Sequence, residues 1–155
     1  SVPFDREGTP TRRNVLISEG TIRQEILDLE SGEALGLGST GNGTLTGPSP
    51  HHVILSPGTE SVTTTRKSIE RGLIIFDTMG AWAGNPFSGN VSGTISLGLL
   101  IEKGEVVGRV KDCMFSINSF KHFKDHLISL SSETKEDGSS TYPYVTLDDV
   151  VISTQ

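Results

Sequence analysis

The sequence predicts a strand-rich α+β fold, in which a mostly antiparallel sheet is interspersed with two or three helices. The first observation is that 18 glycines and 7 prolines are spread through the 155 residues, a composition typical of tight turns between strands. The second is a series of short apolar runs separated by turn residues. The third is that only a few segments carry helix caps or helical spacing. Strands and helices that alternate irregularly in this way favour α+β with antiparallel pairing.

The first third of the chain predicts small elements. Residues 14–28 are typical of a hairpin, with the Glu19-Gly20 pair as its turn. Residues 31–37 fit one or two helical turns that end in glycines. Residues 39–50, composed of Ser, Thr, Gly, Asn and Pro among few apolar residues, predict a loop, and residues 51–55 a short strand.

The middle of the chain predicts a helix followed by a sheet. Residues 61–71 fit a helix with Gly72 as its C-terminal cap. Residues 73–76 are all apolar, which predicts a buried strand. Residues 80–93 form a glycine-rich loop, and a long hairpin follows over residues 93–110, closed by a Lys-Gly turn.

The last third predicts one helix and one strand. Asn118 can cap a helix that runs to about residue 130. Four apolar side chains then share one face of that helix: Phe120, Phe123, Leu127 and Leu130. Residues 131–140 predict a polar loop, and residues 144–152 a closing strand. We expect residues 1–155 to form a single domain, cut from a longer chain because it opens at Ser1 without a methionine.

Charge and composition exclude several classes of function. The net charge of −6 and the pI of about 5.1 argue against direct nucleic-acid binding, which usually needs a basic patch. No apolar run reaches the length of a membrane span. The single cysteine, Cys113, cannot form an internal disulfide, so we expect a reducing, cytoplasmic location. Cys113 itself is expected to be a buried small side chain rather than a nucleophile.

Two patterns resemble ligand sites. Residues 36–41 match the dinucleotide fingerprint G-x-G-x-x-G, but no strand precedes them and no helix follows, so a glycine-rich loop is the expected reading. His122 and His126 are four apart on the expected helix, as zinc ligands can be. The metalloprotease motif needs a Glu after the first His, where this chain has Phe123. Ordinary histidines at the border of an apolar stripe are therefore favoured over metal ligands.

Two charged pairs near the start leave alternatives open. Asp5 and Glu7 lie two apart around Arg6, and such a pair can perform acid–base chemistry, although it more often tethers a loop. Arg12 and Arg13 could bind a carboxylate, such as the C-terminus of a peptide or an acidic group of a partner. Solvated surface arginines are the simpler alternative.

Several segments, in order and at matching spacing, resemble the TldD/PmbA family. Residues 3–13 resemble its F-D-x-E-G-x-P-T-x-R stretch, and residues 16–28 its L-I-x-x-G … L-x-D hairpin. Residues 34–42 resemble A-x-x-L-G-x-x-S-T-G-N, which accounts for the dinucleotide-like pattern. Residues 100–110 and 142–152 resemble its I-E-N-G-E-I … V hairpin and its closing strand. The resemblance covers nearly the whole chain.

One further match departs from the family pattern. Residues 85–92 resemble N-x-x-T-G-D-F-S, but Ser88, Asn90 and Val91 stand where the family has Thr, Asp and Phe. The loss of the aspartate removes a charge.

The resemblance implies the PmbA type, also called TldE. Proteins of the TldD type carry His-Glu-x-x-x-His on an upstream helix and a cysteine ligand near the C-terminus. In this chain residues 137–140, where that cysteine would fall, are Asp-Gly-Ser-Ser, and Cys113 lies too early. The resemblance therefore implies no catalytic residue, no metal ligand and no cofactor in this chain, with zinc expected only in a TldD-type partner.

For function, the resemblance implies a non-catalytic subunit of a TldD/TldE-type zinc metallopeptidase complex that degrades or processes unfolded peptides. The expected partners are a TldD-type subunit, or a second copy in a homodimer, and extended peptides. The family label, modulator of DNA gyrase, would then describe an indirect effect. A stand-alone peptide-binding or scaffold homologue, and a fragment of a catalytic TldD-type enzyme, remain alternatives. The candidate peptide or partner contacts are Arg12, Arg13, Ser39, Thr40, Gly41, Asn42, Asn85, Ser88 and Gly89.

Overall fold

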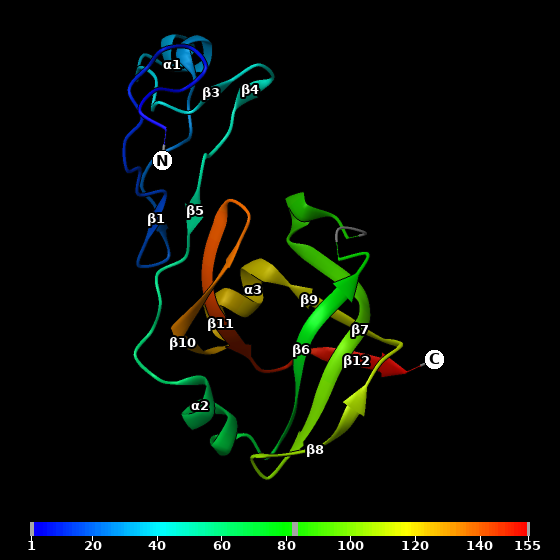
Figure 1. The fold of residues 1–155 in the computed structure, drawn as a ribbon. Helices are drawn as coiled ribbons and strands as arrows, with labels where there is room; N and C mark the ends of the chain where they lie inside the picture. Colours follow the sequence, from blue (N-terminus) through cyan, green and yellow to red (C-terminus); the bar gives the residue numbers. More distant parts are fainter. Residues whose placement is uncertain (1, 82–83, 155) are drawn as a thin grey trace. The chain divides into compact units, whose positions relative to one another are not determined.

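A computed structural model describes residues 2–81 and 84–154 of the chain. These residues divide into two compact units (Figure 1). Unit 1 comprises Ser1–Ile54 and Glu136–Thr141, and unit 2 comprises Leu55–Lys135 and Tyr142–Gln155. The described residues hold three α-helices and a larger number of strands. All the strand pairs with an assigned register are antiparallel except one. The prediction of a strand-rich α+β fold is confirmed.

Unit 1 is built from short elements. Strands β1 (Ile17–Ser18) and β2 (Thr21–Ile22) form the expected hairpin. Its turn residues Glu19 and Gly20 both have positive φ, 51° and 71°, which places a glycine where a left-handed backbone is needed. Within the predicted loop of residues 39–50, a two-residue pair is formed by β3 (Gly43–Thr44) and β4 (Gly47–Pro48).

The helix of unit 1 is defined by its caps. Helix α1 (Leu29–Leu35) begins after Asp28, whose carboxylate accepts the N–H of Ser31. It ends at Gly36, which has a left-handed φ of 68°. Strand β5 (Val53–Ile54) then pairs in parallel with Ser140 and Thr141, the first residues of β11 (Ser140–Leu147).

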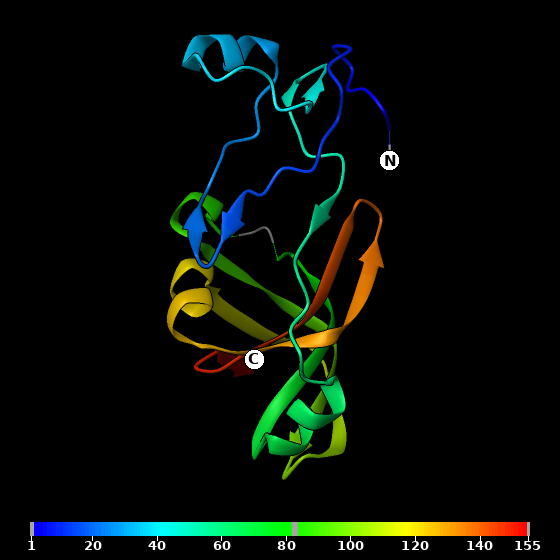
Figure 2. The same cartoon turned by 90° about the vertical axis from the view of Figure 1, so that its left-hand side faces the viewer.

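Unit 2 is organised around one long strand (Figure 2). Strand β7 (Asn90–Glu102) pairs on one side with β6 (Arg71–Met79). On its other side it pairs in succession with β9 (Cys113–Asn118) and β8 (Glu105–Val110). Strand β12 (Val151–Thr154) adds to β9, so β6 and β12 are the two ends of the sheet order.

The core of unit 2 lies on β7 because this strand has neighbours on both sides. Ile95 and Ile101 are completely buried on it. Cys113, the cross-strand neighbour of Ile95, is buried as well, which confirms the sequence expectation for the cysteine.

Three helical segments complete unit 2. Helix α2 (Val62–Ser68) has Ser61 as its N-cap, and a short 3-10 turn, η1, covers Pro86–Ser88. Helix α3 (Ser119–Asp125) begins after Asn118, whose side chain accepts the N–H of Lys121, so the predicted cap is confirmed. In the described parts of the chain, no helix is long and apolar enough to cross a membrane.

The predicted helix from Asn118 to residue 130 is wrong in its second half. Helix α3 ends at Asp125, and β10 (Leu127–Asp137) follows and pairs with β11 (Ser140–Leu147), where a loop had been expected over residues 131–140. Leu127 and Leu130 keep the three-residue spacing of a helix, whereas Ile128 and Leu130 alternate with serines as in a strand, so the sequence fits both. Phe120 and Phe123 are 65% and 45% exposed, and the residue that α3 buries is His122.

Two further boundaries differ from the predictions. Helix α2 ends at Ser68, and Gly72 lies inside β6 instead of capping the helix. The apolar run of residues 73–76 is not fully buried: Ile75 and Phe76 are exposed, because β6 is an end strand and has only β7 beside it among the described residues. The closing strand predicted for residues 144–152 is two strands, since Asp149 adopts a positive φ of 53° between β11 and β12.

Candidate functional site

In unit 1 the Ser-Thr-Gly-Asn loop is buried and hydrogen-bonded internally. The Thr40 hydroxyl accepts the Leu27 N–H at 2.8 Å and donates to the Leu27 carbonyl at 2.9 Å. The Asn42 amide donates to the Thr40 carbonyl at 2.9 Å and to the Thr40 hydroxyl at 3.0 Å. Gly41 has a φ of 74°, and a Cβ there would overlap the Pro10 carbonyl. The loop is therefore fixed by contacts that any larger side chain at Gly41 would disrupt.

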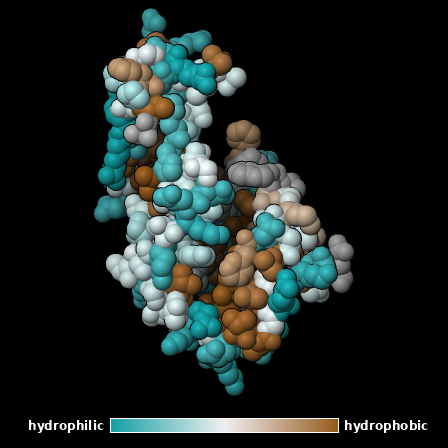
Figure 3. Space-filling model, viewed as in Figure 1, coloured by the Kyte–Doolittle hydropathy of each residue, from teal (hydrophilic) through white to brown (hydrophobic). Residues whose placement is uncertain are grey.

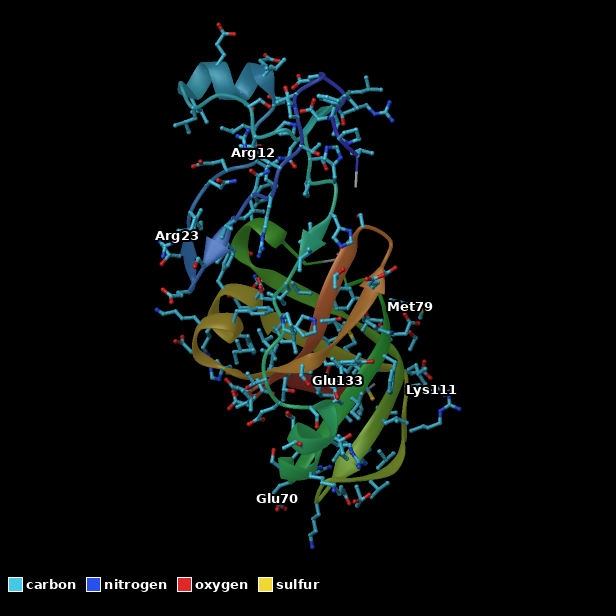
Figure 4. The ribbon with its side chains drawn as sticks, turned by 60° about the vertical axis from the view of Figure 1, so that its left-hand side comes forward. Arg12, Arg23, Glu70, Met79, Lys111 and Glu133 are labelled. Carbon is cyan, nitrogen blue, oxygen red and sulfur yellow. The ribbon has the colours of Figure 1, made fainter. Side chains whose placement is uncertain are left out.

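Arg12 joins this loop from outside. Its Nη2 donates to the Ser39 carbonyl at 2.8 Å, while Ser39 Oγ accepts the Gly41 N–H at 3.1 Å. Arg12 and Arg13 are both exposed, and Figure 4 labels Arg12 beside the strands of unit 1. Six of the nine predicted contact residues are thus in unit 1. Five of these six lie together, because Arg12 is hydrogen-bonded to the loop of residues 39–42.

Asp5 and Glu7 tether this part of unit 1. The Asp5 carboxylate accepts three backbone N–H groups, from Glu7 at 2.9 Å and from Thr9 and Gly43 at 2.8 Å each. The Glu7 carboxylate accepts the N–H of Leu29 at 2.9 Å. Both carboxylates are therefore used in holding loops, which favours the tether over acid–base chemistry.

The same contacts explain the titration of Asp5. Burial raises the pKa of Asp5, but the N–H donors of Gly43, Thr9 and Glu7, together with the nearby charge of His51, lower it by more. The net pKa of Asp5 is below its ordinary value, so the carboxylate is charged at neutral pH. A charged acceptor forms stronger hydrogen bonds, which suits the structural role.

In unit 2 the remaining three predicted residues form one turn. Asn85 Oδ1 accepts the N–H of Phe87 at 3.0 Å, and the Ser88 hydroxyl donates to the Asn85 carbonyl at 3.0 Å. Gly89 is buried with a φ of 75°, and the ring of Phe120 occupies the space that a Cβ would need. This turn belongs to unit 2, whereas the other six residues belong to unit 1.

The turn of unit 2 is anchored to α3 through Asn118. Its Nδ2 donates to the Ser88 carbonyl at 2.8 Å and to Asn90 Oδ1 at 3.0 Å. Asn90 stands where the family pattern has an aspartate, and its amide oxygen serves as an acceptor here. The departure in sequence therefore keeps an acceptor while it removes the charge.

The two histidines of α3 do not fit a zinc ion. His122 is buried, its Nδ1 lies 2.8 Å from the Asn118 carbonyl oxygen, and its Nε2 lies 3.3 Å from the Asp149 carbonyl oxygen. His126 Nδ1 lies 2.8 Å from Asp148 Oδ1. Both nitrogens of His122 are thus engaged by backbone groups, so neither is directed at a shared metal position. Among residues 2–81 and 84–154, no group of three or more His, Cys, Asp or Glu residues is arranged to hold a metal ion.

Sequence reasoning missed an apolar, solvent-exposed strand at the end of the sheet. On β6, Ile75, Phe76 and Met79 are 38%, 46% and 60% exposed. Figure 3 shows apolar side chains gathered in the region of unit 2 where β6 lies, and Figure 4 labels Met79 at the end of this strand. The pairing register shifts between Ile75 and Asp77, which marks a bulge at Phe76. Residues 73–76 are all apolar, and such a run is equally consistent with a central strand and with an end strand.

Comparison with known proteins identifies relatives over the whole chain. The profile of the PmbA/TldA metallopeptidase C-terminal domain matches residues 1–154. The Metalloprotease PmbA homolog of Buchnera aphidicola subsp. Baizongia pistaciae is 26% identical over 97% of this chain and 32% of its own length. The homolog of the same name from Buchnera aphidicola subsp. Acyrthosiphon pisum is 25% identical over 99% of this chain and 33% of its own length. The chain therefore spans about a third of the length of these curated relatives.

Solved structures agree with the sequence relatives. A crystal structure from Thermotoga maritima, described as a candidate modulator of a DNA gyrase, superposes with a TM-score of 0.90 at 28% identity, covering 99% of this chain and 36% of that one. TldE from Thermococcus kodakarensis superposes with a TM-score of 0.87 at 28% identity, covering 98% of this chain and 36% of that one. With a family profile that matches residues 1–154, the chain belongs to the PmbA/TldA metallopeptidase C-terminal domain family.

Proposed function

We propose that this chain is part of a non-catalytic subunit of a TldD/TldE-type zinc metallopeptidase complex, which degrades or processes unfolded peptides. The observation that carries the proposal is the similarity to TldE of Thermococcus kodakarensis over 98% of this chain. The orientation of His122 supports it, because both ring nitrogens are engaged by backbone groups. In this proposal zinc is held by a TldD-type partner, or the chain pairs with a second copy of itself.

The proposed contribution of unit 2 is a binding surface for extended peptides. Strand β6 is an end strand with exposed Ile75, Phe76 and Met79. An extended peptide can add to such an edge through backbone hydrogen bonds, while apolar side chains on the strand accept alternate side chains of the peptide. Backbone pairing is largely indifferent to sequence, which suits a protein that handles many unfolded peptides.

In unit 1 the proposed contacts are the exposed arginines Arg12 and Arg13, which can bind a carboxylate of a peptide or a partner. Ser39 to Asn42 are proposed to shape the surface of unit 1 around these arginines, and the turn with Asn85, Ser88 and Gly89 is proposed as a separate contact of unit 2. The net charge of −6 supports peptide or protein partners over direct nucleic-acid contact, so any effect on a gyrase would be indirect. The single cysteine supports a cytoplasmic location.

Zinc analysis tests the catalytic assignment. The full-length protein is purified alone and together with its TldD-type partner, and zinc is measured by plasma mass spectrometry. We expect zinc only in the pair, at one ion per heterodimer, together with peptidase activity on the oxidised insulin B chain. Stoichiometric zinc in the protein purified alone would refute the non-catalytic assignment. A zinc-free protein that binds peptide without a partner would instead identify a stand-alone peptide-binding module.

A matched pair of variants tests the peptide surface. Met79→Lys places a charge on the exposed end of β6, whereas Val107→Lys places the same charge on β8, where Val107 is also exposed. We expect Met79→Lys to weaken binding of the fluorescein-labelled insulin B chain, measured by anisotropy, by about 10-fold or more, since a buried apolar contact of this size contributes about 1.5–3 kcal/mol. Val107→Lys should leave the affinity within two-fold. Equal effects of the two substitutions would exclude β6 as the peptide surface.

A further inference from the structure

His126 lies between two aspartates of the turn that precedes β12. Its Nδ1 is 2.8 Å from Asp148 Oδ1, and its Nε2 is 3.7 Å from Asp149 Oδ2. The imidazole is three-quarters buried, whereas both carboxylates are more than half exposed. The ring therefore joins the end of α3 to the turn that precedes the end strand of the sheet.

The chemistry of imidazole makes this arrangement depend on protonation. A neutral imidazole has one N–H donor and one lone-pair acceptor, whereas the imidazolium ion has two N–H donors. A neutral His126 can thus face only one of the two carboxylates favourably, and its other nitrogen presents a lone pair to the second carboxylate. Only the charged form attracts Asp148 and Asp149 together.

We propose that protonation of His126 controls how firmly the turn of residues 148–150 and the adjoining strand β12 are held to α3. When the imidazole is charged, it attracts both aspartates and holds the turn at two positions. When it is neutral, one of the two contacts is lost and β12 opens more often. The change is local, because β12 is a four-residue end strand paired only with β9 among the described residues.

Other groups around His126 limit the size of the effect. Lys121 Nζ lies 3.7 Å from Asp149 Oδ2 and keeps that carboxylate paired when His126 is neutral. The His122 ring lies 5.2 Å from the His126 ring, but its Nε2 contacts the Asp149 carbonyl, not a carboxylate. The Asp148 N–H also donates to the His126 carbonyl at 3.0 Å, independently of charge. These contacts hold the turn in place, so protonation adjusts its opening without unfolding it.

Hydrogen exchange of the intact protein tests the proposal. The exchange of a peptide covering residues 148–154 is measured at about pH 5.5 and about pH 8, the range in which histidine changes its charge, and is corrected for the intrinsic pH dependence of amide exchange. We expect protection to fall about two- to five-fold as the pH rises, the factor that exposed ion pairs typically contribute. In His126→Gln, which cannot titrate, the corrected protection should be the same at both pH values.

Two controls make the result specific. Asp149→Asn should reduce the pH effect, whereas Asp125→Asn removes a carboxylate from α3 that lies next to His126 in sequence, yet it should leave the effect unchanged. His52→Gln in unit 1 should also leave it unchanged. The proposal is overturned if His126→Gln retains the wild-type pH effect. It is equally overturned if nitrogen chemical shifts of the His126 ring show a neutral imidazole throughout the range.

Discussion

Thr40 offers the sharpest test of how unit 1 is held together. Thr40→Val keeps the shape of the side chain but removes the hydroxyl, which accepts the buried Leu27 N–H at 2.8 Å. The Leu27 carbonyl keeps another donor, the Thr40 N–H at 3.0 Å, and the Asn42 amide keeps the Thr40 carbonyl as an acceptor at 2.9 Å. The buried Leu27 N–H is therefore the group that loses its acceptor. An unsatisfied buried donor costs about 1–3 kcal/mol. Thr40→Ser keeps the hydroxyl and loses only one methyl group, worth about 0.8 kcal/mol.

The assay is hydrogen exchange on peptides that cover residues 27–43, because the two units of the chain need not unfold together. A loss of about 1–3 kcal/mol corresponds to about 5- to 150-fold faster exchange of these peptides. Thr40→Ser should accelerate exchange by about four-fold at most. Thr46→Val, at an exposed position in the same unit, serves as the control and should change little.

Two outcomes would refute the reasoning. If Thr40→Val and Thr40→Ser exchange at the same rate, the hydroxyl contributes nothing, and only volume matters at this position. If Thr40→Val accelerates exchange equally in residues 90–102 of unit 2, its effect is not confined to the unit that contains Thr40.

Three other predictions concern the core, a glycine and pH. Ile95→Ala should lower the free energy of unfolding by about 2–5 kcal/mol in urea titrations, because the side chain is completely buried; a loss below about 1 kcal/mol would contradict this. Gly41→Ala should destabilise unit 1 more than Gly36→Ala in thermal melts, since both have positive φ but only the first would place its Cβ against the Pro10 carbonyl. The pKa of Asp5 is lower in the folded protein than in the unfolded chain, so the charged carboxylate stabilises the fold. This stabilisation is complete at pH values above the pKa of the unfolded state, and it is lost as the pH falls through the pKa of the folded state. Asp5→Asn should therefore flatten the acid side of the stability–pH curve, and an unchanged curve would show that its backbone contacts do not stabilise the charge.

The short-range features of the fold were predictable because their causes are local. The left-handed Gly36 ends α1, Asn118 caps α3, and the Lys103-Gly104 turn closes the β7–β8 hairpin. Each depends on a backbone conformation or a cap hydrogen bond within a few residues. The ordered family motifs likewise identified the family from sequence alone, and the profile match confirms it.

The motif residues could be found in the sequence, but their roles could not. Asp5 and Thr40 are recognisable as parts of motifs, yet only the structure shows that they bond to backbone groups of Gly43 and Leu27, which are distant in sequence. Whether the nine candidate residues contact a peptide or a partner stays a prediction. For eight of them, all but Arg13, the structure shows which hydrogen bonds or packing contacts within this chain they already make.

The sequence by itself determined the class of the fold, its caps and turns, and the family. The tertiary structure alone decided where α3 ends, because the spacing of apolar residues in 127–130 fits both a helix and a strand. The pairing of β10 with β11 selects the strand. It also decided that His122 is buried while Phe120 and Phe123 are exposed. Burial depends on which elements pack together, and hydrophobicity along the chain does not specify that packing. The same reason explains β6, whose apolar run is exposed because the sheet ends there.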